Sequence, residues 1–295
     1  FECDVESICA NQNSHFNYQG LYVLRHSPSN YLVMRSGNIL SRYGQQADQL
    51  HVDIWSGGRN IAIDAGSYNY NRSLNVHNWF RGTLSHNTVI VGEVDQMIPH
   101  RTFKYLNWTK GFSRQINLNN HLAIAGVHDG YTRLNGKWCH ARVLIYIDNS
   151  LLVLDRVWPL KFTSESCKLR LHWQFDLEIE KLSENLGVVS INCEHNRLLF
   201  LCSQDNAIFS TKRGSNEPLD GWVSRYYNTK SAVQAINYSA ATNDETWFLS
   251  VVSAQDRNSK INLGISHIKI DGRKEINLQS VRKISNEMIS EILVQ

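Results

Sequence analysis

Length, composition and charge exclude several classes of protein. The 295 residues, 42% of them hydrophobic, can bury a large core in one big β domain or in two smaller domains. The formal net charge of +3 is too small for a nucleic-acid-binding surface, and no Lys/Arg-rich block occurs. No uninterrupted apolar run is long enough to span a bilayer. The chain begins at Phe1 without a signal segment, which is typical of a fragment or a mature product.

The first residues divide into a lead segment and a hairpin. Residues 1–18 are polar and lack a hydrophobic period, so we interpret them as a linker or edge segment and residues 19–295 as one β-sandwich domain. Within residues 19–36, the alternating runs LYVLRH and YLVMRS flank the turn signal SPSN. This pattern predicts a β-hairpin.

A second hairpin is predicted directly after the first. Its strands alternate over 49–55 and 60–65, and Gly57 and Gly58 form the turn, because glycine tolerates positive φ. One register gives a wholly apolar face and a polar pair on the other face. The apolar pairs are Leu50/Ala65, Val52/Ile63 and Ile54/Ile61, and the polar pair is His51/Asp64.

The predicted pair of His51 and Asp64 has two interpretations. It can be a polar contact on a half-exposed sheet, which stabilises by roughly 0.2–1 kcal/mol. It can also be part of a site, in which Asp64 orients His51 or both residues hold a metal ion. The spacing of the two residues leaves both interpretations open.

The rest of the chain continues the alternation of short strands and turns. The predicted strands are 121–127, 142–147, 151–157, 169–175, 186–192, 197–202, 233–238, 246–253 and 262–270. Only residues 286–294 have a plausible helical pattern, and a strand fits them equally well. So many short strands with few helical patterns predict an all-β chain, built as a large antiparallel two-sheet β-sandwich.

Two ordered motifs follow the run ADQLHVDIW. They are Asp64-Ala65-Gly66-Ser67-Tyr68 and Arg81-Gly82-Thr83-Leu84-Ser85-His86-Asn87-Thr88. In this order they resemble the heparinase II/III-like family of polysaccharide lyases, where an H-x-H-x-D segment precedes D-[SA]-G-x-Y and R-[ST]-x-x-H-N-[ST]. Weaker similarity continues through 128–138, 141–157 and 221–227.

The resemblance implies a fold and an architecture. Lyases of this family have a supersandwich-like β domain that follows a helical (α/α) toroid, and the catalytic groove lies between the two domains. This sequence supplies no series of amphipathic helices. We therefore expect a toroid domain in the parent protein or on another chain. We also expect the isolated chain to be incomplete as an enzyme.

The resemblance also implies a divalent cation, Zn or Ca. Such lyases often bind it through the second His of H-x-H-x-D, the Asp of D-[SA]-G and the His of H-N. These positions fall on Gln46, Asp64 and His86, and the first His, which has a catalytic role, falls on Gly44. An amide oxygen is a poor substitute for imidazole at a zinc site, so we expect a weak or absent cation. His51 partly compensates if it lies beside Asp64.

The implied reaction is β-elimination on a uronate, which needs a clamp for the carboxylate, a base and an acid. Arg81 and Asn87 are candidates for the clamp, with Gln46 and Tyr68 as further substrate contacts. His51, or alternatively His86, is the candidate base near neutral pH. Tyr70, or alternatively Tyr68, can protonate the leaving oxygen or stack on a sugar ring. In the family, the tyrosine acid belongs to the toroid.

Each of these residues also has a purely structural interpretation. Tyr68 and Tyr70 can be aromatic residues at the edge of the sandwich, and His86 can be a core histidine. His77 and Trp79 lie in a loop-like segment and can be ordinary surface residues. The sequence alone does not decide between these roles.

Three functional hypotheses follow from these observations. The first is the β-sandwich module of a lyase that acts on an acidic polysaccharide. The second is a non-catalytic sandwich that binds or scaffolds polysaccharide in cell-envelope or exopolysaccharide metabolism. The third is a purely structural or protein-interaction domain, since fold alone does not determine function. The substrate class favours the cell envelope or periplasm as the location.

Overall fold

The computed structural model describes most of the chain as strands. The described residues are 14–16, 20–38, 46–71, 73–148, 150–177, 179–181, 188–191, 197–253, 261–264, 266–270 and 274–294. Part of the predicted lead segment, residues 1–13, lies outside them. The described residues 14–16 form an edge strand that pairs with the next strand.

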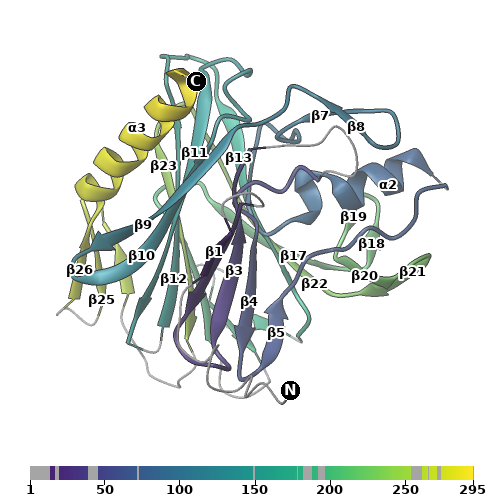
Figure 1. Ribbon diagram of the computed structural model, residues 1–295, viewed down its shortest axis with the longest axis horizontal. Coiled ribbons are helices and arrows are strands. Elements are labelled where there is room, and N and C mark those ends of the chain that lie inside the picture. The colour runs from purple at the N-terminus through teal and green to yellow at the C-terminus, as the bar shows by residue number, and fades with distance from the viewer. Residues whose placement is uncertain are drawn as a thin grey trace, which may run out of the picture.

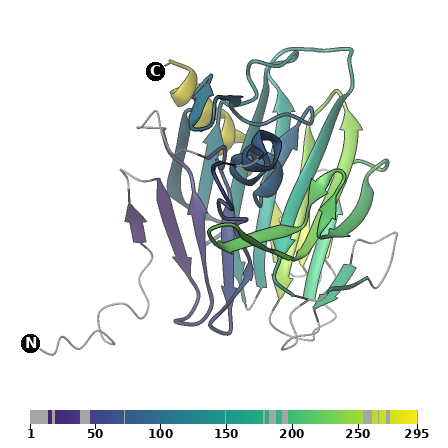
Figure 2. The same ribbon diagram turned by 90° about the vertical axis from the view of Figure 1, so that its right-hand side faces the viewer.

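Two large antiparallel sheets confirm the predicted β-sandwich (Figures 1 and 2). Among the described residues, the nine-stranded sheet has the order β1 (Ser14–Phe16), β2 (Leu21–Arg25), β3 (Tyr31–Arg35), β4 (Val52–Ser56), β5 (Arg59–Ala62), β13 (Cys167–Phe175), β22 (Gln234–Thr242) and β17 (Ile208–Arg213), with β6 (Val89–Val91) beside β13. The eight-stranded sheet has the order β14 (Ile179–Lys181), β15 (Val188–Ile191), β16 (Arg197–Cys202), β23 (Thr246–Ser253), β12 (Ser150–Pro159), β11 (Trp138–Ile147), β10 (His121–His128) and β9 (Gly111–Leu118).

Smaller elements cover the edges of the sandwich. The short hairpins are β7 (Ile98–His100) with β8 (Lys104–Leu106), β18 (Ser215–Asn216) with β19 (Leu219–Asp220), and β20 (Trp222–Tyr226) with β21 (Thr229–Ala232). A three-stranded sheet contains β24 (Ile261–Leu263), β25 (His267–Ile270) and β26 (Lys274–Asn277). Among the described residues, the helices are α2 (Leu74–Arg81), the 3-10 turn η1 (Thr83–Ser85) and α3 (Leu278–Val294). Figure 1 shows α2 and the β18–β21 hairpins together, on the opposite side from α3.

The strands β10, β11 and β12 of the eight-stranded sheet are buried on both faces, and α3 packs on the outer face of β10 and β11. Along β11, Leu144 points into the core between the sheets, whereas Val143 and Ile145 point toward α3. Side chains of α3 such as Met288 and Ile292 complete this second core. The final segment is therefore a helix and not a strand. It begins before the predicted residue 286, because the side-chain oxygen of Asn277 accepts the N–H groups of the first turn.

The second hairpin confirms the predicted turn at Gly57–Gly58 and corrects the register. Ser56 pairs with Arg59 and Trp55 with Asn60, but a bulge then pairs Ile54 with Ala62 instead of Ile61. The cause is β13, since the Ile63 N–H donates to the Gln174 carbonyl (3.0 Å) and the Asp176 N–H donates to the Ile61 carbonyl (3.1 Å). His51 and Asp64 therefore lie beyond the ladder and do not face each other within it.

The segment before η1 also differs from the prediction. Residues 74–81 form a helix, and His77 and Trp79 are buried in its inner face instead of lying on a surface loop. His77 is fixed by the backbone, because its Nδ1 lies 2.9 Å from the Asn69 carbonyl and its Nε2 lies 2.6 Å from the Thr102 carbonyl.

Candidate functional site

Three predicted site residues converge at one end of the nine-stranded sheet. His51 precedes β4, Asp64 follows β5, and His86 follows η1. The distance from His86 Nδ1 to Asp64 Oδ2 is 3.0 Å, and His51 Nε2 lies 3.8 Å from the same oxygen. The donor atoms of this triad all lie within 4.8 Å of one another. The predicted convergence is confirmed, and we call these three residues the open triad.

Backbone contacts fix the orientation of Asp64. Its Oδ1 accepts the Gly66 N–H at 2.6 Å, and its own N–H donates to Asp53 Oδ1 at 3.0 Å. Gly66 has a φ of +75°, and a Cβ at this position would lie 2.2 Å from the Ser224 carbonyl oxygen. This position therefore requires glycine. The turn leaves Asp64 Oδ2 directed at the two histidines.

Asn87 connects the strands below the triad. Its Nδ2 donates to the carbonyls of Val52 (2.9 Å) and Ile63 (3.2 Å), and its Oδ1 accepts the Gln174 N–H at 2.7 Å. The Asn87 backbone N–H donates to His51 Nδ1 at 2.9 Å. Asn87 is 0% exposed. Its amide is thus committed to backbone groups, and the geometry gives Asn87 a positioning role instead of the predicted substrate contact.

A buried arginine from the other sheet supports the same backbone. Arg142 on β11 donates to the carbonyls of Leu50 and Asn87, both at 2.6 Å. These residues directly precede His51 and follow His86, and Leu50 has a φ of +61° that is unfavourable for a residue with a Cβ. Asp155 holds the guanidinium through bonds of 2.7 and 3.0 Å. Sequence reasoning missed Arg142, because it lies in an ordinary strand pattern.

The electrostatics of the triad favour a charged Asp64. Burial alone would raise the pKa of Asp64, but the facing imidazoles of His86 and His51 and the Gly66 N–H outweigh it and lower this pKa. Burial alone would lower the pKa of His51. The carboxylates of Asp53 and Asp64 outweigh that burial and raise the pKa of His51. The triad is therefore an acidic group with two imidazole partners.

The triad fits a divalent cation only in part. The Nε2 atom of His86 is buried without a hydrogen-bond partner, as expected for a ligand, and its Nδ1 lies 3.0 Å from Asp64 Oδ2. His51 is less suitable, because its Nδ1 accepts the Asn87 N–H and the neutral ring then carries its proton on Nε2, the nitrogen that faces Asp64. The same proton conflicts with the predicted base role of His51. In the described part of the chain, Gln46 is half-buried and makes no hydrogen bond with the triad.

Arg81 is committed to the backbone of a neighbouring loop. Its Nη2 donates to the carbonyls of Arg101 (3.0 Å) and Lys104 (3.1 Å), and its guanidinium packs over the Tyr105 ring. The side chain is buried, and this burial lowers the pKa of Arg81. The predicted role as a carboxylate clamp is not supported by these contacts, which instead attach the 101–104 loop to α2.

The two predicted tyrosines have different environments. Tyr68 is half-buried and stacks on Phe80 of α2, with ring centroids 5.2 Å apart. Tyr70 is 43% exposed and contacts other aromatic rings at the surface. Of the two, Tyr70 is the more exposed to solvent.

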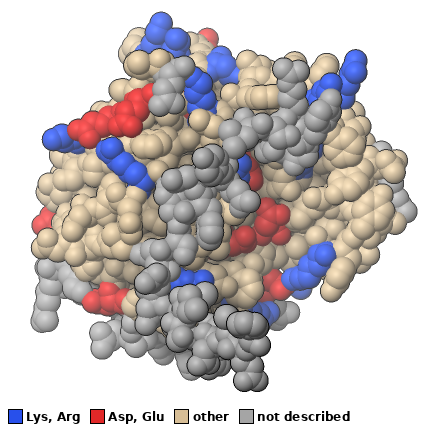
Figure 3. All heavy atoms as spheres, in the orientation of Figure 1, with Lys and Arg blue, Asp and Glu red and all other residues tan. Residues whose placement is uncertain are grey.

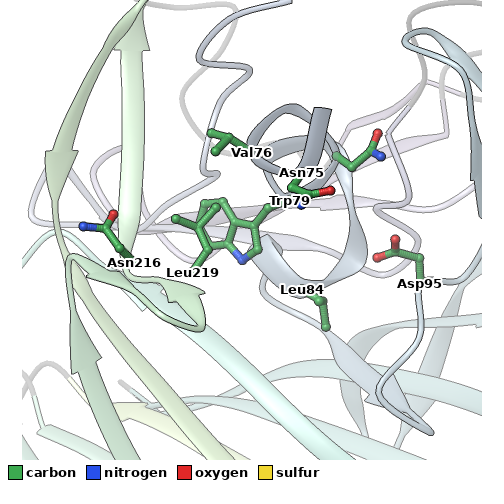
Figure 4. Close-up of a pocket in the computed structure, with 8 residues that line it drawn as sticks. Asn75, Val76, Trp79, Leu84, Asp95, Asn216 and Leu219 are labelled. Atoms are coloured by element: carbon green, nitrogen blue, oxygen red, sulfur yellow. The ribbon is translucent and has the colours of Figure 1, made fainter. Parts of the chain in front are cut away.

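A pocket of about 410 Å³ opens beside the triad. It is lined by Asp64 together with Asp53, Arg59, Asp176, Ser224 and Arg225, among others. A second pocket of about 330 Å³ lies between α2 and the β18–β19 hairpin. Figure 4 shows Trp79 and Leu219 at its centre, with Asp95 on the far side of Leu84. Because Asp64 lines the first pocket and not the second, the first pocket is the one that lies at the predicted site.

The molecular surface has mixed charge. On the face shown in Figure 3, acidic and basic side chains are interspersed without a broad surface of one sign. Neither α2 nor α3 has the length and apolar character that crossing a membrane requires. Recognition of an anionic ligand would therefore depend on local groups of basic residues.

Comparisons with known proteins place this geometry in a family. The model of the heparinase II/III-like C-terminal domain matches residues 10–272. Heparin-sulfate lyase from Bacteroides stercoris is 23% identical over 285 residues, which cover 88% of this chain and 39% of that protein. The solved structure of a heparinase III superposes with a TM-score of 0.70 at 17% identity, over 90% of this chain and 42% of that one. Heparan sulfate lyase HepC from Pedobacter heparinus gives a TM-score of 0.65 at 19% identity, over 90% and 42%.

This chain thus spans only 39% to 42% of the length of these relatives. The family match nevertheless covers both large sheets and all three residues of the open triad. The chain belongs to the heparinase II/III-like C-terminal domain family.

Proposed function

We propose that this chain is the β-sandwich module of a polysaccharide lyase that acts by β-elimination on an acidic, uronate-containing polysaccharide. The observation that carries the proposal is the open triad, whose Asp64 lines a pocket in a chain of this lyase family. The relatives named above as heparin or heparan sulfate lyases support the substrate class. Such a module would function where acidic polysaccharides occur, in the cell envelope or periplasm.

In this reaction a base removes the proton from the carbon next to the uronate carboxylate. The electron pair of that C–H bond forms a C=C bond, the bond to the 4-linked oxygen breaks, and this oxygen takes up a proton. Of the two tyrosines predicted to transfer a proton, Tyr70 is the exposed one. In this proposal His51 acts through its Nε2–H as a hydrogen-bond donor, because Asn87 occupies its other nitrogen.

A divalent cation, when bound, would supply positive charge against the carboxylates of the site. Asp64 and His86 are the two suitable ligands, and His51 is a poor third. We propose that this site is weak, since Gln46 occupies the position of the family's other histidine. The chain's own contribution is to hold the carboxylate of Asp64 against two imidazoles at the edge of the pocket.

The missing proton-transfer groups would come from a helical toroid domain. This partner is proposed because the chain spans less than half of the length of its relatives. We expect the chain alone to give no unsaturated uronate from heparan sulfate. The full product of the reading frame that contains the chain should give it. Tyr70→Phe in the full product should lower the rate by about 10²–10⁴-fold, the usual contribution of a general acid or base.

The observation that favours a non-catalytic polysaccharide-binding domain is the loss of both family histidines at Gly44 and Gln46. The same assay separates the two functions. A full product that binds heparan sulfate but forms no unsaturated uronate from it or from other uronate polysaccharides would support binding or scaffolding. Turnover by the isolated chain would show that the acid and base both belong to this domain.

A further inference from the structure

Three segments that are far apart in the sequence bring aromatic rings together at the surface. Tyr70 follows the D-A-G-S-Y motif, Phe103 lies in the β7–β8 turn, and Tyr227 lies in the β20–β21 turn. The Tyr70 ring centroid is 5.4 Å from that of Phe103 and 5.7 Å from that of Tyr227. The three residues are 43%, 41% and 61% exposed, respectively. We call this group the aromatic patch.

The backbone beneath the aromatic patch is held in place. The Asn228 N–H donates to the Tyr68 carbonyl, and the Ser224 N–H donates to the Ala65 carbonyl, both at 2.7 Å. These bonds attach the β20–β21 hairpin to the segment between Asp64 and Tyr70. Arg81 attaches the third segment through the carbonyls on both sides of Phe103. The rings are therefore pre-organised, which lowers the entropy lost when a ligand binds.

The charges of these three segments indicate what the patch recognises. Residues 65–88, 96–111 and 221–235 contain seven Lys and Arg residues and no Asp or Glu, although the whole chain has 30 basic and 27 acidic residues. Arg101 and Arg225 are exposed, and Arg225 forms an ion pair with Asp176 at 2.5 Å. Exposed rings next to basic groups, with no acidic group in the same segments, are complementary to an anionic ligand that also has apolar faces.

We propose that the aromatic patch is a binding platform for an acidic polysaccharide, on which one sugar ring stacks while Arg101 contacts a carboxylate or sulfate group. This inference rests on the proposed function for its ligand class. The Ser224–Ala65 bond joins the β20–β21 hairpin to the residue that follows Asp64, and Ser224 and Asp64 both line the pocket beside the open triad. A sugar ring fits this surface because its C–H face packs on aromatic rings and its polar edge stays in water.

The test measures binding of size-defined heparan sulfate oligosaccharides to the chain by calorimetry. Phe103→Ala and Tyr227→Ala should each weaken binding about tenfold, the effect of removing about 1.4 kcal/mol. Phe162→Ala is the matched control, because Phe162 is 92% exposed outside the patch, and its affinity should not change. Arg101→Ala should weaken binding and reduce its salt dependence. Circular dichroism verifies that each variant is folded.

Several outcomes would overturn this inference. They are an absence of binding by the unmodified chain, equal affinities of the patch variants and the Phe162→Ala control, or equally strong binding of neutral dextran. Loss of association with a helical domain in the patch variants, with unchanged heparan sulfate binding, would identify a protein interface instead. Elimination by the full product separates the two proposals. If the full product still carries out elimination while the patch variants bind heparan sulfate with unchanged affinity, the proposed binding platform is wrong and the lyase proposal stands.

Discussion

Two groups of histidine and aspartate residues lie on opposite sides of the same stretch of backbone. They differ in how many of their polar atoms have a hydrogen-bond partner. In the core, Asp155 accepts from both Arg142 and His140, and His140 in turn contacts His128 at 3.2 Å. In the open triad, His86 Nε2 has no hydrogen-bond partner, and His51 Nε2 lies 3.8 Å from Asp64 Oδ2, beyond hydrogen-bond distance. The residue types are alike. The unpartnered imidazole nitrogens, together with an aspartate that lines a pocket, distinguish the candidate site from the structural network.

The two groups are mechanically connected. Arg142 belongs to the buried network, yet its Nη1 holds the carbonyls of Leu50 and Asn87, the neighbours of the triad histidines. The buried network thus has a structural effect on the site without contact with a substrate. The comparison predicts large stability effects from changes in the network and large ligand-binding effects from changes in the triad.

The largest expected effect is the loss of the buried arginine. Arg142→Met leaves the Asp155 carboxylate buried without its main partner, which should lower the free energy of unfolding by about 3–5 kcal/mol. The matched control is Arg225→Met, which removes an exposed ion pair worth about 0–1 kcal/mol. Urea denaturation measures both. Equal effects of the two variants would show that the network does not support the fold.

The next effect concerns the turn that orients Asp64. Gly66→Ala introduces both an unfavourable positive φ and a contact with the Ser224 carbonyl, whereas Gly58→Ala introduces a positive φ alone. The φ penalty should be about 1–2 kcal/mol in each variant. The steric contact should add about 1–3 kcal/mol for Gly66→Ala. Thermal unfolding of both variants measures the difference, and similar values would contradict the close approach of the β20–β21 hairpin.

Substitution within the triad should affect cation binding more than stability. Asp64→Asn keeps the shape and removes the anionic ligand, so affinity for Zn or Ca should fall by at least about 10–100-fold. Asp155→Asn, in the buried network, serves as the matched control, and its cation affinity should be unchanged if the variant folds. Calorimetric titration with each metal measures the affinities. A larger loss of cation affinity in Asp155→Asn than in Asp64→Asn would mean that the cation does not bind at the open triad.

The smallest effect is a pH dependence of stability that comes from the buried network. Burial lowers the pKa of His128 and His140, in the second case against the opposing effect of Asp155. The unfolded chain binds protons near pH 6.5 and the folded chain does not, so stability is lost as the pH falls below that value. His128, whose pKa burial lowers furthest, should contribute a slope of up to about 1.4 kcal/mol per pH unit. Urea denaturation at several pH values should show a smaller slope for His128→Gln than for the unmodified chain, and an unchanged slope would contradict this assignment.

The sequence predicted the parts of the molecule that depend on local pattern. Strand alternation predicted the two-sheet sandwich, and the family motifs predicted that Asp64 and His86 converge near His51. The bulge at Ile61 was missed, because it depends on backbone bonds to β13, more than a hundred residues away. For the same reason, no local pattern revealed that Arg142 holds the carbonyls of Leu50 and Asn87. The functional roles of the triad residues stay predictions.

Helix α2 and the aromatic patch show a second limit. In α2 the apolar residues Val76, Trp79 and Phe80 have helical spacing, but eight residues are too few for a periodicity argument from the sequence alone. The patch combines Tyr70 with residues from two distant turns. One signal was available for it, since the three segments that form it all lack acidic residues. Charge asymmetry between segments can therefore indicate contacts that hydrophobic periodicity does not.

The most direct test of the open triad as the functional site is a cation titration of the unmodified chain beside Gln46→His, both prepared free of chelator. If Asp64 and His86 form a weakened cation site, the unmodified chain should bind zinc weakly, and the restored imidazole should raise the affinity by about 10–100-fold. Adding Asp64→Asn to Gln46→His should abolish that gain. Stoichiometric zinc in the unmodified protein, or an unchanged affinity in Gln46→His, would contradict the account.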